Sequence, residues 1–398
     1  MIRFTTAGES HGRALVAIVE GVPAGLPLLA SDVDADLARR MRGYGRGARM
    51  RIEVDRAQIL SGVRAGETLG SPIALLIENL DFANWRDVMA VEPPEEPPRR
   101  RLTRPRPGHA DLAGVLKYDR RDARDVLERA SARETAARVA AGAVCRRLLA
   151  EFGVEIGSHV VALGGVDAHV PEVLPVPLNA AADASPVRCL DPVAEAAMVA
   201  RIDAARDAGD TLGGVAEVVV RGLPVGLGSH VSWDRKLDAR LAAAWMSIPA
   251  VKGVGIGLGF AAAGAPGSKA HDEIFAAERG QADRAGGFRR PTNRAGGIEG
   301  GMTTGEPLIA RLAMKPIATL MRPLASVDLD TREPAQAQSE RSDVVAVPAM
   351  AVIAEAMAAL VLADAWAEKF GGDSLGEMRR NVEGYFAQLA ERRDAPRL

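Results

Sequence analysis

The order of its helical and strand-like segments is the feature of this sequence that most limits the possible fold. Strand-like apolar runs are expected at Ala14–Val19, Arg51–Leu60, Ile73–Ile77, Ser158–Leu163, Val215–Val220 and Leu308–Ala313. Helices are expected from Ser31, where Asp34 completes a capping box, to Met41, and over Asp122–Phe152, Pro192–Ala208, Asp234–Trp245 and Ala349–Phe370. The two kinds of segment do not alternate regularly, which disfavours a parallel βαβ sheet and predicts a layered α+β fold.

Domain organisation is not marked in the sequence. Length alone favours two or three domains for 398 residues, but no shift in composition shows a boundary. The loop at Glu92–Pro98 holds four prolines and is too short to separate two domains. The last twenty or so residues, about 375–398, are polar and are expected to fray as a peripheral tail.

Targeting and membrane signals are weak. The longest apolar run near the N-terminus, Ala14–Val19, ends at Glu20, so a secretory signal is not predicted. The apolar stretch Val344–Leu362 is interrupted by Pro348 and Glu355, which favours a buried helix over a membrane span.

Charge and cysteine usage narrow the class further. A net charge of −2 gives no global reason to expect binding to nucleic acid or to an acidic membrane. Of the 50 basic residues, 44 are arginine, a ratio that coding bias could explain, although it does not explain their clustering. Cys145 and Cys189 show no CxxC spacing, so neither a disulfide framework nor a metal site is predicted, and a reduced cytoplasmic setting fits.

Several common motifs do not occur. The sequence contains no GxGxxG, no GxxxxGK[ST] and no HExxH, so it does not support a Rossmann dinucleotide site, a P-loop or a zinc protease site. The glycines of Gly253–Gly259 recur with a period of two, which is typical of a strand that another backbone approaches closely.

Two histidines lie in glycine-containing turns. His11 belongs to the run AGESHG, and His109 follows Gly108 in RPRPGHAD. An accessible imidazole titrates near neutral pH and can move a proton. Pro105 and Pro107 stiffen the second loop, as a preorganised anion site requires. A plain surface turn for the first motif and a solvated charge run for the second stay open.

Arginine is concentrated in two loops. Residues 39–51, RRMRGYGRGARMR, hold six arginines and no acid, and residues 99–106 hold five more. Guanidinium groups match carboxylates and phosphates in two-point geometry, which favours binding of a small anion. A solvated basic loop remains possible, and RNA would find only Tyr44 for stacking in the first loop.

Three further segments could border such a site. Arg129 and Arg133 share a helix face, although surface ion pairs would explain them as well. Residues 293–305 include glycine pairs, whose N–H groups can face a phosphate or a flat ring, or simply form turns, and residues 314–319 follow them closely. Asp343 could be a base or half of an ion pair. Together the motifs suit a ligand with more than one anionic group.

With these residues in view, the chain resembles the chorismate synthase family. The blocks that carry the resemblance, in the family's order, are AGESHG, GYGRGARM, RPRPGHAD, ERASARETAARVAAGAV, DTLGGV, GLPVGLGS, DRKLDARLA, EGGMTTGEP, MKPIATL, QSERSD and KFGGDSLGE. They cover nearly the whole chain, and so many blocks in register rarely arise by chance.

The resemblance implies a carbon–oxygen lyase of the shikimate pathway, which serves aromatic amino-acid biosynthesis. The reaction implied is 1,4-elimination of phosphate from 5-enolpyruvylshikimate 3-phosphate, giving chorismate. The family requires reduced FMN although there is no net redox change. Also implied is a cytoplasmic homotetramer. Each chain, 1–398, would be a single domain in which long helices are sandwiched between antiparallel sheets, which outweighs the domain count from length.

Residue roles follow from the same resemblance. His11 would act as an acid near the leaving phosphate or the flavin, His109 would stabilise or protonate reduced FMN, and Asp343 would help the flavin N5 accept the substrate proton. The arginines that would hold the substrate are Arg40, Arg46, Arg49, Arg106, Arg133 and Arg341. The residues near FMN would be Arg129, Ala130, Ser131, Ala132, Pro249, Ala250, Gly300, Lys315, Pro316, Ile317, Ala318 and Thr319, with His109 and Arg341 at its border.

Three positions depart from the family pattern. Ala130 stands where many members have serine, so one hydroxyl is missing. Pro249 stands where many have an amide residue, and its lack of an N–H leaves only carbonyl or packing contacts from that main chain. Gly255 stands where members often have glutamate, and the sequence indicates no consequence.

Two rival functions fit parts of the pattern. An ordinary flavin oxidoreductase would consume reduced nicotinamide stoichiometrically. The missing nicotinamide fingerprint disfavours it, and favours an external flavin reductase over the NADP-dependent activity found in some family members. An RNA-binding module would lose affinity steeply with salt, and an aromatic content of 4% disfavours it.

Overall fold

The strands of this protein pair in antiparallel fashion. In the computed structural model, which describes residues 1–93, 101–277, 283–339 and 343–394, they form two larger sheets and four two-stranded pairs. The first sheet has the order β1-β2-β6-β3, with β1 at Arg3–Ala7, β2 at Ala14–Glu20, β6 at Ile73–Glu78 and β3 at Ala57–Ile59. The second has the order β10-β15-β9-β7-β8, with β10 at Val251–Ile256, β15 at Leu308–Met314, β9 at Gly214–Arg221, β7 at Glu155–Leu163 and β8 at Val166–Asp167. The small pairs are β4 (Val63–Arg64) with β5 (Glu67–Thr68), β11 (Phe275–Ala276) with β12 (Phe288–Arg289), β13 (Ile298–Glu299) with β14 (Met302–Thr303), and β16 (Ala325–Val327) with β17 (Pro334–Gln336).

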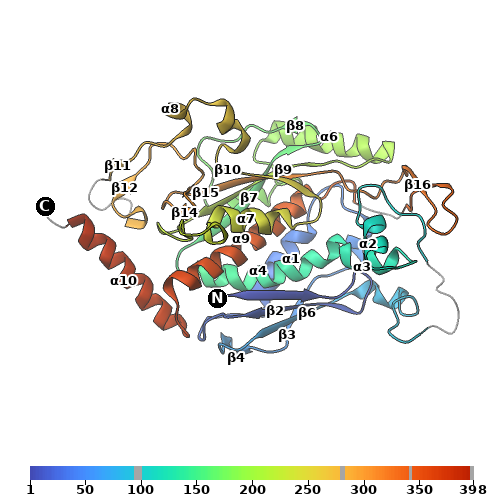
Figure 1. Cartoon of the computed structure of the whole chain (residues 1–398), viewed down its shortest axis with the longest axis horizontal. Coiled ribbons are helices and arrows are strands. Elements are labelled where there is room, and N and C mark those ends of the chain that lie inside the picture. The colour runs from blue at the N-terminus through green and yellow to red at the C-terminus, as the bar shows by residue number, and fades with distance from the viewer. Residues whose placement is uncertain (94–100, 278–282, 340–342, 395–398) are drawn as a thin grey trace.

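Helices fill the space between the two larger sheets (Figure 1). α4 (Thr135–Ala150) packs on β2 and β6, whereas α9 (Val347–Phe370) packs on β7 and β9. The two helices meet so closely that a Cβ atom added at Gly142 would lie 2.5 Å from the Cβ of Ala356. Beside them pack α1 (Ala30–Met41) and α7 (Leu237–Met246). The other helices are α2 (Asp111–Lys117), α3 (Arg124–Ala130), α5 (Leu178–Ala182), α6 (Pro192–Ala208), α8 (Gly267–Ala270) and α10 (Leu375–Asp394), with 3-10 turns η1 (Ala48–Arg51), η2 (Leu80–Asn84), η3 (Ala132–Glu134), η4 (Trp233–Arg235), η5 (Gly259–Gly264) and η6 (Asp283–Ala285).

The α+β class is confirmed, and several predicted elements are found where the pattern indicated. α6 has the predicted bounds, and α9 begins two residues before its prediction. α9 is apolar enough, by length and composition, to cross a membrane, but 89% of its most apolar 18-residue stretch is buried inside the protein. The prediction of a buried helix is therefore confirmed. Only the first part of the glycine run lies in a strand, because β10 ends at Ile256; just beyond it the carbonyl of Arg294 accepts a hydrogen bond from the N–H of Leu258.

The prediction of one long helix over Asp122–Phe152 is wrong in one respect, because the helix is interrupted at Ser131. This residue has an extended backbone (ψ 144°), and its hydroxyl accepts a hydrogen bond from the N–H of Arg133. The chain therefore ends α3, makes the short turn η3 and restarts as α4. Serine competes with helical hydrogen bonding in this way, and the break brings residues 130–132 to the candidate site described below.

Two predictions near the N-terminus are also wrong in detail. Only Ala57–Ile59 of the predicted strand Arg51–Leu60 is a strand. The residues before it carry the buried carboxylates Glu53 and Asp55, which pair with arginines instead of continuing a ladder. The first helix begins at Ala30, and Asp32 rather than Asp34 accepts the capping bond, from the N–H of Leu29 at 2.8 Å.

Residues 375–394, the described part of the predicted C-terminal tail, form a helix instead of fraying. α10 lies at the edge of the molecule (Figure 1), where Leu375, Met378 and Val382 are buried. The hydroxyl of Tyr385 donates to the carbonyl of Val225 at 2.9 Å. These residues recur at three- and four-residue spacing, which is the spacing of one helical face. The predicted loop at Glu92–Pro98 lies for the most part outside the described residues.

Candidate functional site

The candidate site is a cavity of about 540 Å³ next to α2 and α3. Segments far apart in the sequence line it: the loop after β1, the turn η1, the loop before α2, the end of α3, the start of β10, the end of β15 and the segment before α9. The predicted residues found in its lining are His11, Arg49, Arg106, His109, Ala130, Ser131, Ala132, Pro249, Ala250, Lys315, Ile317, Ala318, Thr319 and Asp343.

His11 is held on three sides. Its Nδ1 lies 2.9 Å from both carboxylate oxygens of Glu128, and its backbone N–H donates to Glu128 Oε2 at 2.8 Å. The indole of Trp85 stacks on the imidazole, with ring centroids 4.0 Å apart. Arg49 Nη1 lies 3.3 Å from His11 Nε2. The ring therefore has one orientation, and Nε2 is the nitrogen that can meet a ligand.

His109 is held in a similar way. Its Nδ1 lies 2.6 Å from Asp111 Oδ1, and Arg106 donates to the same carboxylate from Nε at 2.8 Å. Burial alone would raise the pKa of Asp111, but the hydrogen bonds from His109 and Arg106 hold it well below its usual range. Arg106 Nη1 also donates to the hydroxyl of Thr319 at 2.8 Å, which joins this loop to the end of β15.

Asp343 enters the cavity from the segment before α9. Its Oδ1 accepts a hydrogen bond from the N–H of Gly47 at 2.6 Å. Arg46 Nε lies 3.0 Å from Asp343 Oδ2, an ion pair without hydrogen-bond geometry. Arg46 lines a smaller adjoining cavity of about 180 Å³, which shares Asp343 and Thr319 with the larger one.

Cations dominate the charged lining. Among the described residues, the cations that line the cavity are Arg49, Arg106, Lys252 and Lys315, and its carboxylate is Asp343. Arg49 Nη1 donates to the hydroxyl of Ser10 at 2.7 Å, and Arg49 also pairs with the buried Glu53. Lys315 donates to the carbonyl of Gly108. This surplus of positive charge suits a ligand with several anionic groups.

Arg40 and Arg133 lie beneath the cavity and are not part of its described lining. Arg40 Nη1 lies 3.2 Å from Asp55 Oδ2, and Arg133 makes an ion pair with the other oxygen of the same carboxylate. Arg133 Nε also donates to Asn79 Oδ1 at 2.8 Å. Both guanidinium groups are nearly inaccessible, with side chains 4% and 3% exposed. In this structure they support the floor of the site.

We expect Arg133→Met to lower the free energy of unfolding by about 3–5 kcal/mol, because it leaves part of a buried charge network without its partner. Urea unfolding monitored by fluorescence measures this loss. Arg121→Met, at an exposed position, is the control and should change stability by less than about 0.5 kcal/mol. A fully stable Arg133→Met protein with only a raised KM would contradict this structural role and support the substrate-binding role predicted from the sequence.

Some predicted residues lie elsewhere. Arg129 donates to the hydroxyl of Thr6 at 2.7 Å and to the carbonyl of Gly8 at 3.0 Å. Gly300 lies in the turn between β13 and β14, and neither it nor Pro316 is in the described lining of the cavity. Arg341 is outside the described residues.

Sequence reasoning also missed residues. Glu128 and Asp111 stand within recognised blocks, but their sequence pattern does not distinguish them from ordinary helix acids. Nothing in the sequence around Trp85 or Lys252 marked them as site residues, because only the folded chain brings them to the site.

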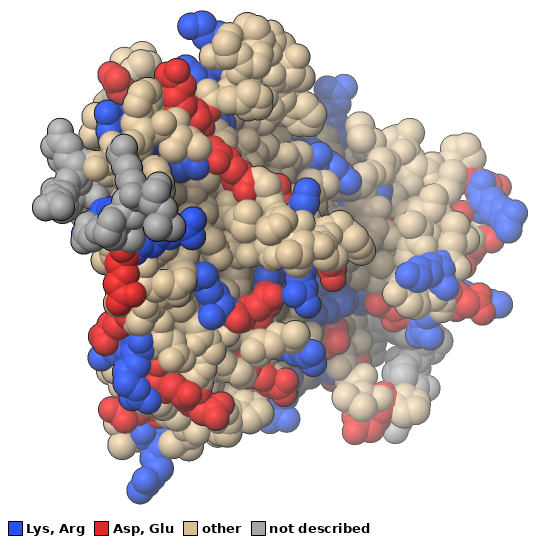
Figure 2. Space-filling view, turned by 60° about the vertical axis from the view of Figure 1, so that its left-hand side comes forward, with Lys and Arg blue, Asp and Glu red and all other residues tan. Residues whose placement is uncertain are grey.

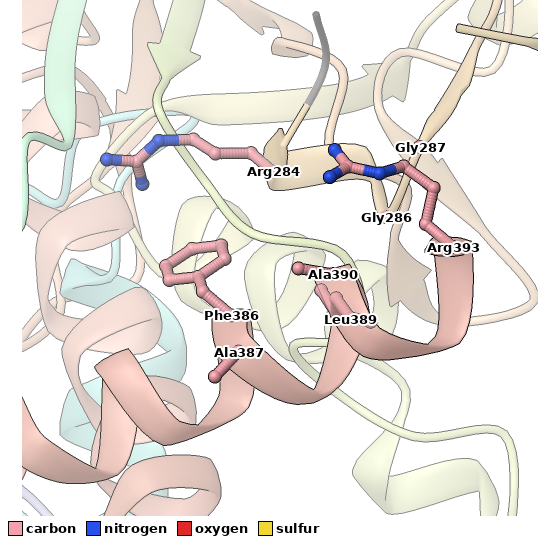
Figure 3. Close-up of a pocket in the computed structure, with 8 residues that line it drawn as sticks. All are labelled: Arg284, Gly286, Gly287, Phe386, Ala387, Leu389, Ala390 and Arg393. Atoms are coloured by element: carbon pink, nitrogen blue, oxygen red, sulfur yellow. The ribbon is translucent and has the colours of Figure 1, made fainter. Parts of the chain in front are cut away.

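A second cavity, of about 510 Å³, lies between α10 and residues 284–287 (Figure 3). Phe386, Leu389 and Ala390 face it from the helix, and none of the predicted site residues lines it. Figure 2 brings this side of the molecule forward, and basic and acidic side chains are interspersed over the face it shows. We therefore take the cavity with the two histidines as the candidate site.

An α+β fold with a cation-rich cavity that holds two histidines and a carboxylate is typical of an enzyme that acts on a small molecule. Comparison with known proteins gives the family. The family model for chorismate synthase matches residues 2–367. A chorismate synthase of Geobacter sulfurreducens is 58% identical over 386 residues, which cover 97% of this chain and 98% of that protein. One of Symbiobacterium thermophilum is 59% identical over 398 residues, with coverage of 98% and 100%.

A solved structure agrees with the sequence relatives. A crystal structure of a chorismate synthase superposes with a TM-score of 0.78 at 43% identity, and the overlap covers 98% of each chain. The chain belongs to the chorismate synthase family, whose enzymes are carbon–oxygen lyases.

Proposed function

We propose that this chain catalyses the 1,4-elimination of phosphate from 5-enolpyruvylshikimate 3-phosphate, giving chorismate. The observation that carries the proposal is the meeting of His11, His109 and Asp343 with four cations in one cavity. In this reaction the C–O bond to phosphate and one C–H bond break, and a C=C bond forms. Phosphate and a proton leave, so the substrate is neither oxidised nor reduced overall.

The cations suit the charges of this substrate. It carries two carboxylates and one phosphate, and Arg49, Arg106, Lys252 and Lys315 face the cavity that would hold it. Arg49 and Arg106 are each tied to a carboxylate that keeps the guanidinium group in place, Glu53 and Asp111 respectively. Such preorganised donors stabilise developing negative charge without reorganising when the phosphate departs.

The remaining lining fits FMN. Small or aliphatic groups such as Ala110, Ala250, Met314 and Ala318 provide an apolar wall that a flat ring system can contact, beside a lysine that can meet a phosphate. Residues 130–132 and 315–319 would hold the flavin. If FMN binds there in its reduced form, it would supply the electron that assists departure of phosphate, with no net redox change.

Proton transfers fall to this chain's own residues. His11 and His109 each have Nδ1 occupied by a carboxylate, so each can hold or release a proton at Nε2. Asp343 has one oxygen bonded by the N–H of Gly47 and the other beside Arg46, and these contacts hold the carboxylate at the cavity, where it would accept a proton. His11 would serve the leaving phosphate, and Asp343 and His109 the side of the cavity that holds the flavin.

The wider setting is part of the same proposal. We propose a cytoplasmic homotetramer of single-domain chains, each with long helices between antiparallel sheets. An external flavin reductase would supply reduced FMN. The layering of α4 and α9 between the two sheets supports the single domain.

An anaerobic assay tests the function. Purified protein is mixed with 5-enolpyruvylshikimate 3-phosphate and substoichiometric, chemically reduced FMN, and chorismate and phosphate are followed together. We expect many turnovers per flavin and one phosphate per chorismate. A folded, FMN-binding protein that makes no chorismate, or that consumes reduced nicotinamide in proportion to product, would contradict the proposal.

We expect Asp343→Asn to lower kcat by about 10²–10⁴-fold, the usual contribution of a proton-transfer group. Asparagine keeps an oxygen for the N–H of Gly47, so FMN binding and folding should be retained. Titration of FMN fluorescence and thermal unfolding provide those two controls. Loss of folding instead would identify Asp343 as a structural partner of Arg46.

A further inference from the structure

We infer that Glu128 and Asp111 are the positioning residues of the two histidines, holding the proton of each ring on Nδ1 so that Nε2 faces the reaction. The inference goes beyond residues that contact the substrate, and it deepens the proposed function, on which its kinetic part rests. It stands on hydrogen-bond geometry around two separate rings.

Glu128 is committed to His11. Its carboxylate is almost fully buried, with 3% of the side chain exposed, and it accepts from both the backbone N–H and the ring of His11. Arg124 Nη1 donates to Glu128 Oε1 at 2.8 Å from the preceding helical turn. The carbonyl of Glu128 accepts the N–H of Ser10 at 2.8 Å. One residue therefore fixes both the ring of His11 and the loop that carries it.

The carboxylate is ionised in this setting. Burial alone would raise the pKa of Glu128, but the hydrogen bonds from His11 and Arg124 lower it. An ionised carboxylate only accepts hydrogen bonds, so Nδ1 of His11 must donate. The remaining nitrogen, Nε2, then accepts from Arg49 when the ring is neutral. The charged groups that face this ring are Glu128, Arg49, Arg124 and Asp81.

The arrangement around His109 repeats this pattern with different residues. Asp111 is 3% exposed, and its Oδ1 lies 2.6 Å from Nδ1 of His109. Arg106 binds the other oxygen from Nε, and its Nη2 lies 3.0 Å from His109 Nδ1 and 3.5 Å from His109 Nε2, so the shorter 2.6 Å contact with Asp111 is the one that sets the proton on Nδ1. Asp111, Arg106 and the nearby Lys315 are the charged groups that face this ring. As at His11, the carboxylate beside Nδ1 can only accept a hydrogen bond. Nδ1 therefore carries the proton, and Nε2 is left to meet the ligand.

Both carboxylates stand on one small helical unit. Asp111 begins α2, and Glu128 lies in α3. The two helices approach so closely that a Cβ atom added at Gly114 would lie 2.3 Å from the side chain of Val126. A small core of its own joins them, made of Leu102, Val115, Ala123 and Leu127. A rigid pair of helices thus sets both rings relative to each other.

The amide variant Glu128→Gln keeps the size of the side chain but changes its hydrogen bonding, so it separates the effect on the ring of His11 from any effect on packing. Three groups around this carboxylate all donate to it: Arg124, the N–H of His11 and the ring of His11. A glutamine replaces one oxygen with an NH₂ group, and this group faces the ring whichever oxygen it replaces, because Nδ1 of His11 lies 2.9 Å from both. Only the imidazole can change from donor to acceptor, by moving its proton from Nδ1 to Nε2. Glu128→Gln should therefore switch the tautomer of His11.

The test uses the full-length protein labelled with ¹⁵N-histidine, whose six histidines are assigned by single substitutions. In the ligand-free wild type, we expect the Nδ1–H tautomer for neutral His11 and His109. We expect Glu128→Gln to show the Nε2–H form at His11, and Asp111→Asn to show it at His109. In each variant kcat should fall by at least about tenfold with a smaller change in KM. Glu128→Asp, which keeps the charge, should recover part of both readouts.

Glu217→Gln is the matched control. Glu217 pairs with the buried His159 at 3.1 Å and does not line the cavity, so this variant should change only the signals of His159. A folded Glu128→Gln protein whose His11 keeps the Nδ1–H form would overturn the inference, as would a tautomer switch that leaves kcat unchanged. If one variant does not fold, the other carries the same test. Failure of the wild type to make chorismate would refute the proposed function, while the spectra still decide the geometry.

Discussion

Replacing His109 with alanine is expected to lower kcat by about 10²–10⁴-fold while the protein stays folded. The ring lines the cavity and its side chain is 19% exposed, so little apolar packing is lost. Its hydrogen bond to Asp111 is lost, but Arg106 continues to neutralise that carboxylate. The loss of rate should therefore come from the missing proton carrier at Nε2, and KM should change less than kcat.

Steady-state kinetics under anaerobic conditions, with thermal unfolding alongside, measures this effect. His230→Ala is the control, because His230 is exposed and does not line the cavity. It should leave kcat and the unfolding temperature unchanged. A folded His109→Ala enzyme with full activity would remove His109 from the mechanism and leave proton transfer to His11 and Asp343.

Local sequence patterns predicted the regular elements well and the breaks poorly. α6 follows its pattern closely because a proline, an aspartate cap and a terminal glycine mark its ends. The break at Ser131 had no comparable mark, since the same segment reads as continuous helix by propensity. The hydrogen bond from Arg133 to the serine is joined there by tertiary contacts, because Ser131 and Glu128 contact the loop at Ser10, more than a hundred residues away.

The catalytic candidates were predictable, whereas their partners were not. His11, His109 and Asp343 stand in recognisable blocks and meet in the cavity. The carboxylate of Glu128 reaches His11 across 117 positions of sequence, and Trp85 covers the same ring from another loop. A single sequence contains no local signal for either contact.

Arginine was the least reliable guide to the site. The first arginine-rich loop suggested one anion-binding surface, but the fold gives three of its members different tasks. Arg49 lines the cavity, Arg40 pairs with Asp55 beneath it, and Arg39 pairs with Glu355 in the core. A guanidinium group serves a ligand and a buried carboxylate with the same geometry, so composition cannot separate these roles.

The buried carboxylate of Glu355 is the clearest case in which arginines bind a carboxylate of the protein instead of a ligand. It lies in the middle of α9 with a fully buried side chain. Arg39 donates to both of its oxygens at 2.9 Å, and Arg146 donates at 2.6 Å. Arg188 donates at 3.1 Å, and the hydroxyl of Ser158 adds another bond. This one anion thus connects α1, α4 and β7 to the central helix.

We expect Glu355→Gln to lower the free energy of unfolding at neutral pH by about 3–5 kcal/mol, because three guanidinium groups lose their common anion. Burial alone would raise the pKa of Glu355, but Arg39, Arg146 and Arg188 hold it far below the usual 4.5. A lowered carboxylate pKa contributes stability above the unfolded value, and that contribution is lost as the pH falls through the folded value. The gap between wild type and variant should therefore be widest near neutral pH and should narrow below about pH 4.5.

Urea unfolding of both proteins across this pH range measures the gap. Glu368→Gln is the matched control on the same helix: its side chain is 49% exposed and pairs with Arg240 at the surface. That variant should cost less than about 1 kcal/mol at every pH. If Glu355→Gln lost as much stability in acid as at neutral pH, its effect would come from packing rather than from charge. If it lost none, the arginines of the core would be satisfied by Asp36 and Asp183, which also pair with them.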